Sequence, residues 1–84
     1  MRGGRHKYGD FESNAKVVVN IIDTISDHAS ESGTALDPDQ RLAMTMICVK
    51  LGRIVNGHQD QIDSWLDIAG YAKLVADRMA RDCE

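Results

Sequence analysis

Apolar residues recur at a helical period in three successive segments of this chain, and no other feature constrains its fold as strongly. The first segment carries the three- and four-residue spacing of an amphipathic helix at Val17, Val18, Ile21, Ile22 and Ile25. One proline and 5% aromatic residues do not fit an all-β fold. We therefore predict an all-α, three-helix domain over residues 1–84. A polar lead covers 1–12, and the helices span about 13–30, 38–56 and 60–81.

The second segment has the clearest boundaries. Asp37 can cap a helix, Pro38 fits its first position, and Gln40 stands where a capping box needs it. Asn56-Gly57 predicts the end, because both residues tolerate left-handed backbone geometry. Glu31–Thr34 predicts the preceding loop.

The small size of the chain predicts self-association. Eighty-four residues are near the length at which a single core is marginal. The second helix carries one apolar ridge from Met44 to Val55 and another from Leu42 to Val49. A helix that is apolar nearly all round is buried on several sides, and two partner helices do not easily cover both ridges. We therefore predict a homodimeric helical bundle.

Aromatic residues and one glycine supply further fold predictions. Tyr8–Phe11 reads as a turn that holds two aromatic rings against the domain. Trp65 is predicted to lie in the core, on the apolar side of the third helix with Ile62, Ala69 and Ala72. Gly70 interrupts that helix and predicts the close approach of a neighbouring helix or, less commonly, of a ligand.

Composition excludes several classes of function. A net charge of −3 disfavours sequence-independent binding to nucleic acid. No run approaches the eighteen apolar residues that suggest a membrane span. Cys48 and Cys83 sit in unrelated segments, so they predict neither a disulfide framework nor a metal knuckle. A soluble protein of a reducing cytoplasm is the expectation.

An acidic arc follows the start of the third helix. Asp60, Asp63 and Asp67 stand at i, i+3 and i+7, within roughly 60° of one helix side. Most such faces are simply solvated. Carboxylate oxygens are also the ligands that Mg²⁺ prefers, so these three residues are the candidate metal ligands. Tyr71 lies on or beside the same arc and is a candidate ligand-binding residue.

Two cations interrupt the apolar second helix. Lys50 and Arg53 either extend their charged heads to water over apolar surface or pair with the acidic arc. Both could neutralise phosphate, Arg53 through its forked donors. Asp10 either adds a ligand or holds the N-terminal turn. The sequence has no Ser-His-Asp set, phosphate-cradling glycine loop or zinc spacing, so catalytic residues are not assigned.

Three motifs carry a family resemblance over about residues 5–76. They are Arg5-x-x-Tyr8-Gly9-Asp10-Phe11, Lys50-x-x-Arg53 and His58-x-Asp60-x-x-Asp63-x-x-x-Asp67-Ile68-Ala69-Gly70-Tyr71. This combination resembles small helical bacteriophage and prophage proteins of unassigned function. It is similar, more distantly, to nucleotide-modification-associated domains and MazG-like nucleoside-triphosphate pyrophosphatases. The resemblance implies a helical, often dimeric fold with a nucleotide site in which acids hold magnesium. Lys50 and Arg53 stand where the pyrophosphatases carry paired glutamates.

Three functions follow as hypotheses. The first is a phage protein that binds or hydrolyses nucleotides with Mg²⁺ in the host bacterial cytoplasm. The second is a non-catalytic phage protein that inhibits or redirects a host complex, for example a defence system. The third, a nucleic-acid accessory factor, is disfavoured by the net charge.

Overall fold

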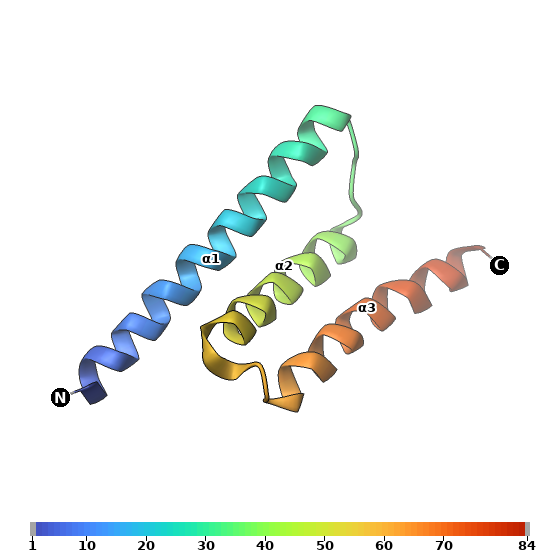
Figure 1. Cartoon of the computed structure of the whole chain (residues 1–84). Coiled ribbons are helices and arrows are strands. Elements are labelled where there is room, and N and C mark those ends of the chain that lie inside the picture. Colours follow the sequence, from blue (N-terminus) through green and yellow to red (C-terminus); the bar gives the residue numbers. More distant parts are fainter. Residues whose placement is uncertain (1, 84) are drawn as a thin grey trace.

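The protein is built from three helices in the order α1, α2, α3. The computed structural model describes the backbone of residues 2–83 and the side chains of residues 11–83. The helices are α1 (Arg2–Ser32), α2 (Pro38–Arg53) and α3 (Ile62–Cys83), with a short π-turn, η1 (Ile54–His58), between the last two (Figure 1). No strand occurs within residues 2–83, so the all-α prediction is confirmed.

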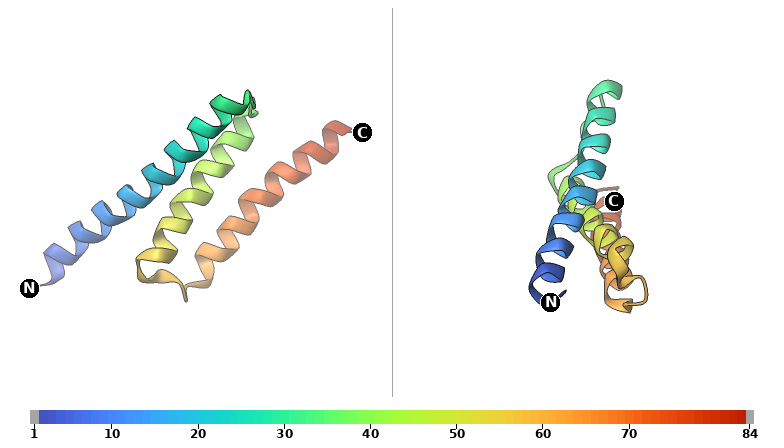
Figure 2. Two further views of the ribbon diagram at one scale, coloured as in Figure 1. Left: turned by 45° about the horizontal axis from the view of Figure 1, so that its top comes forward. Right: turned by 60° about the vertical axis from the view of Figure 1, so that its left-hand side comes forward.

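The helices form a single layer with α2 in the middle. α2 packs against α1 on one side and against α3 on the other (Figure 1), and the right-hand view of Figure 2 shows the layer closer to edge-on. The molecule measures 56 × 30 × 15 Å. A helix with its side chains is about 10–12 Å across, so the layer is little more than one helix deep. The two apolar sides of α2 are thus explained by its two neighbours, and they are not by themselves a reason for a dimer.

Local sequence signals fix the start of α2 as predicted and end α1 at Ser32, two residues later than predicted, whereas α2 ends at Arg53 and gives way to η1 before the predicted stop. The backbone N–H of Asp37 donates to Gln40 Oε1 at 2.8 Å, as in a capping box at the start of α2. Gly33 has φ +71°, and the N–H of Thr34 donates to the carbonyl of Ala29 at 2.9 Å, which closes α1 in a Schellman motif. Gly57, with φ +103°, turns the chain toward α3.

The prediction of a polar lead over residues 1–12 was wrong. α1 already begins at Arg2, the expected turn at residues 8–11 is helical, and the Phe11 ring is exposed instead of held against the domain. No proline precedes Pro38, and each added residue gains a backbone hydrogen bond once a helix is nucleated. Glycine costs a helix about 1 kcal/mol per residue, which weakens this segment without ending it.

The predicted core position of Trp65 was also wrong. The side of α3 that meets α2 is the stripe of buried and half-buried residues Ser64, Ile68, Tyr71, Val75 and Arg78. Trp65 is half exposed, and its indole N–H donates to the carbonyl of Gln59 at 3.0 Å. This stripe carries Arg78, which pairs with Asp39 of α2, and the small, buried Ser64. Gly70 makes no close approach, because a Cβ there would meet nothing within 4 Å.

Across residues 2–83 we find no helical stretch with the length and hydrophobicity that crossing a lipid bilayer requires.

Candidate functional site

Polar side chains from all three helices gather at one end of the layer. There α1 near Ser13 and the end of α2 lie together, and the first turns of α3 follow on the other side of α2 (Figure 1). Lys50 Nζ lies 3.0 Å from Asp67 Oδ2, with the lysine side chain 17% exposed and the carboxylate side chain 48% exposed. Of the two cations on α2, Lys50 thus pairs with the predicted acidic arc through Asp67, whereas no ion pair joins Arg53 to the acids of that arc among the described side chains.

The other predicted ligands do not gather around this pair. Asp60 lies in the turn before α3, so it does not share a helical face with Asp63 and Asp67. Asp63 is exposed. Among the described side chains, no group of three or more His, Cys, Asp or Glu residues lies close enough to hold a metal ion. The side chain of Asp10 lies outside the described residues.

Asp60, Asp63 and Asp67 therefore do not come together as one metal site in the described part of the chain. The Asp67 carboxylate already accepts from an ammonium group, and a cation would have to displace it. Tyr71 is half-buried in the α2–α3 seam, one helical turn after Asp67.

Arg53 instead belongs to a small polar pocket on the α1 side of α2. The pocket has a volume of about 150 Å³ and is lined by Phe11, Asn14, Arg53, Asn56 and His58. Its walls come from α1, the last turn of α2 and η1. Arg53 is exposed, and no carboxylate among the side chains of residues 11–83 pairs with it.

Hydrogen bonds hold the wall of this pocket in place. Ser13 Oγ donates to Asn56 Oδ1 at 2.8 Å, and Asn56 Nδ2 donates to the carbonyl of Gly52 at 2.7 Å. Asn56 thereby satisfies a carbonyl at the end of α2 and joins η1 to α1. Because both of its polar atoms are used, the Asn56 carboxamide has one orientation.

Asn14 carries an unsatisfied acceptor in the same wall. Its Oδ1 is buried and has no hydrogen-bond donor among the described residues. A buried unpaired acceptor costs about 1–3 kcal/mol, and such groups call for an explanation. Gly52 makes the close approach possible, because a Cβ at that position would collide with the Asn14 oxygen. The wall of the pocket therefore contains a buried, unsatisfied acceptor beside the five N–H donors of a guanidinium.

The sequence pattern assigned Asn56 only to a helix end and predicted no site role for Asn14 or Gly52. The signal that could have found them is Gly52 itself, a glycine inside an otherwise regular helix and next to Arg53. Gly70 has the same signal but lies on an exposed side of α3.

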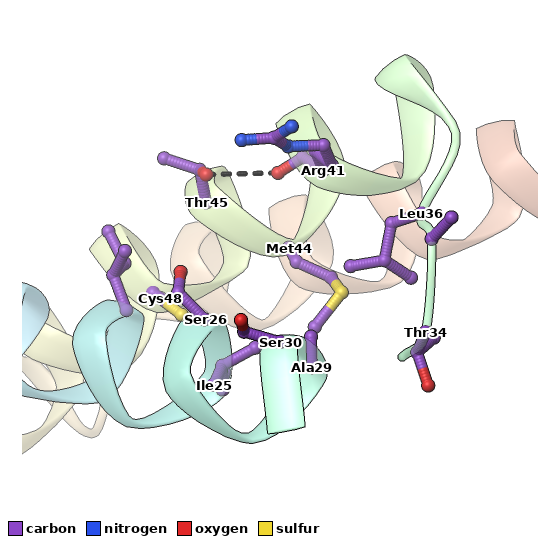
Figure 3. Close-up of a pocket in the computed structure, with 12 residues that line it drawn as sticks. Ile25, Ser26, Ala29, Ser30, Thr34, Leu36, Arg41, Met44, Thr45 and Cys48 are labelled. Carbon is purple, nitrogen blue, oxygen red and sulfur yellow. Dashed lines mark hydrogen bonds between the residues drawn. The ribbon is translucent and has the colours of Figure 1, made fainter. Parts of the chain in front are cut away.

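A second, larger cavity lies toward the other end of the layer. It has a volume of about 390 Å³ and runs between α1, the α1–α2 loop and α2. Figure 3 shows Met44, Leu36 and Ala29 around it, with Arg41 and Thr45 above. Cys48 is buried in its wall, and burial raises the pKa of its thiol, so this cysteine is a packed side chain and not an activated nucleophile.

A cluster of acids around Arg78 is structural. Arg78 donates to Asp39 at 2.7 and 2.9 Å, to Asp37 at 2.8 Å and to Asp82 at 3.0 Å. The hydrogen bonds from Arg78 lower the pKa of the Asp39 carboxyl, and the three carboxylates raise the pKa of the guanidinium. This cluster ties the start of α2 to the last turns of α3.

Comparisons with known proteins give one positive result. No curated protein and no solved structure matches the chain significantly. The sequence profile of the DUF6378 domain, described as a domain of unknown function, matches residues 2–79. Because that match covers nearly the whole chain, the protein belongs to the DUF6378 family.

Proposed function

We propose that this protein binds a nucleotide in the pocket of Arg53. The observation that carries the proposal is the buried, unpaired Asn14 Oδ1 in the wall that Arg53 also lines. A phosphate accepts from the forked guanidinium of Arg53, and an N–H group of a nucleobase supplies the missing donor once the Asn14 carboxamide turns its buried Oδ1 toward the pocket. The exposed Phe11 ring at the pocket offers a surface on which a base can stack.

The resemblance to phage proteins and to MazG-like pyrophosphatases supports the same ligand class. It predicts a nucleotide site between helices, in a protein that acts in the cytoplasm of a bacterial host. Lys50 is held by Asp67, so Arg53 carries the phosphate contact in this proposal. Hydrolysis and a magnesium-dependent step are not part of it, because the described acids do not form a metal site.

Calorimetric titration with AMP, ADP and ATP, each with and without Mg²⁺, tests the proposal. We expect saturable binding by the wild type and a loss of about tenfold to a hundredfold in Arg53→Gln, because a hydrogen bond to a charged group contributes about 1.5–3 kcal/mol. Arg81→Gln is the matched control, since it removes an exposed arginine from the far end of α3. Absence of heat with every nucleotide, or equal losses in both variants, would contradict nucleotide binding at this pocket.

A second candidate function is that of a non-catalytic protein that binds a host complex. The larger cavity between α1 and α2 favours it, because Ile22, Ile25, Leu36 and Met44 give it an apolar wall that an apolar side chain of a partner could fill. Ser26→Arg places a long side chain in this cavity from an exposed α1 position. Asn20→Arg is the control, because it places the same side chain at an exposed α1 position that does not line the cavity. A host protein that co-purifies with the wild type and with Asn20→Arg, but not with Ser26→Arg, would support this second function.

A further inference from the structure

The side of α3 next to the α2 contact is apolar and exposed. Its large residues Ile62, Trp65 and Met79 are 66%, 50% and 45% exposed. The exposed alanines Ala69, Ala72 and Ala76 lie between Trp65 and Met79. Steps of four and three residues place these positions along one stripe of the helix. We call Trp65, Ala69, Ala72, Ala76 and Met79 the α3 stripe.

The solvent-accessible area of the whole chain is larger than that of a compact monomer of the same mass. A compact monomer of 9.3 kDa exposes about 5,000 Å², whereas this chain exposes 6399 Å². Its radius of gyration is 15.3 Å, against about 12 Å for a compact domain of this length. This excess of roughly 1,400 Å² is spread over the whole chain, and it is larger than the ~800 Å² that each partner buries in a standard interface.

The interior of the layer is correspondingly small. Among the described residues, the only buried apolar side chains are Ala43 and Cys48. Burial of apolar area is the dominant favourable term in folding. A layer with so little of it needs a second surface on which to pack.

We propose that this surface is a second copy of the chain, with α3 packed antiparallel on α3. The two ends of the α3 stripe are symmetrical about Ala72, because Trp65 and Met79 lie the same number of residues before and after it. A two-fold axis at Ala72 sets Trp65 against the partner's Met79, a favourable contact between a thioether and an aromatic ring. Ala72 then lies opposite its own counterpart, and the small side chains of Ala69 and Ala76 on either side of it let the two backbones approach closely.

Charge does not oppose this pairing. The α3 stripe contains no ionisable residue. Beside it, Lys73 Nζ lies 2.9 Å from Asp77 Oδ2 within the same helix, and Arg78 is held by three carboxylates. These charged groups therefore satisfy one another within each copy and do not need the partner.

Sedimentation of the full chain tests the proposal. The wild type should sediment at twice the chain mass at micromolar concentration. Ala72→Glu puts a charge at the centre of the stripe and should weaken the dimer at least tenfold. Leu74→Glu is the control, because Leu74 is exposed on another side of α3 and its loss removes more apolar surface. A folded monomeric wild type, or equal effects of the two variants, would overturn the proposal.

Disulfide cross-linking tests the same α3 pairing even if the Ala72→Glu variant does not fold as a monomer. Ala72→Cys in a Cys83→Ser background places a thiol on the two-fold axis, and mild oxidation should give a disulfide-linked dimer in high yield. Leu74→Cys in the same background should not cross-link. The reverse pattern, or no cross-link in the Ala72→Cys variant, would contradict the antiparallel α3 pairing. Neither position lines the Arg53 pocket, so failure here leaves the nucleotide proposal standing.

Discussion

Gly52 sets how closely α1 can approach the end of α2. A Cβ there would collide with Asn14 Oδ1 and would lie 2.7 Å from Val18 Cγ2. We expect Gly52→Ala to lower the free energy of unfolding by about 1–3 kcal/mol, because overpacking outweighs the better helix propensity of alanine. Gly70→Ala, at an open position of α3, should raise it by about 0.5–1 kcal/mol. Urea unfolding of both variants measures the difference, and a change of the same sign in both would contradict the close approach at Gly52.

Ion pairs join α2 to α3 near both ends of their contact. Lys50 pairs with Asp67 at one end, and Arg78 pairs with Asp39 at the other. The two pairs are separated by the same number of residues along each helix, so they fix one antiparallel register.

The Asp39–Arg78 pair makes this register sensitive to acid. Because the folded pKa of Asp39 is lowered, the stability that the pair adds is complete above the unfolded pKa of about 3.9 and is lost as the pH falls through the folded value. We expect Asp39→Asn to be less stable than the wild type at pH 6, and the difference to shrink below about pH 4 in thermal unfolding. In an Arg78→Gln background Asp39→Asn should have little effect at either pH, and a pH-independent difference between Asp39→Asn and the wild type would contradict the role of this pair.

The positions of the helices along the chain could be predicted from the sequence better than the faces through which the helices pack. The start of α2 at Pro38 and the turns at Gly33 and Gly57 follow from local backbone chemistry, which acts over a few residues. The face of α3 that packs against α2 does not follow from local chemistry. Trp65 and Ser64 lie on two different stripes of the helix, and only the contact with α2 determines which stripe is buried. The Lys50–Asp67 pair was predictable from charges that interrupt an apolar pattern. The Asn14 acceptor was not, because it depends on α1 and α2 meeting at Gly52.

At the scale of the whole molecule, the proposed pairing would give the single layer of helices a second packing surface. Folding and association are then coupled, so stability depends on the concentration of the chain. A tenfold increase in concentration should add about 1.4 kcal/mol per dimer and raise the melting temperature by several degrees. Circular dichroism melts from micromolar to hundreds of micromolar chain measure this shift. A melting temperature that stays constant over that range would show that one layer is stable alone.

Nucleotide binding beside Arg53 is tested most directly by following the amide signals of the ¹⁵N-labelled protein during a titration with AMP. The side-chain NH₂ signals of Asn14 and Asn56 should shift saturably, together with the backbone signals of Phe11 and His58, because these residues line the pocket. Adenosine without phosphate should shift them far less, because it offers nothing to the guanidinium. No shift at millimolar AMP, or shifts confined to the α1–α2 cavity around Ser26 and Met44, would contradict the proposed function.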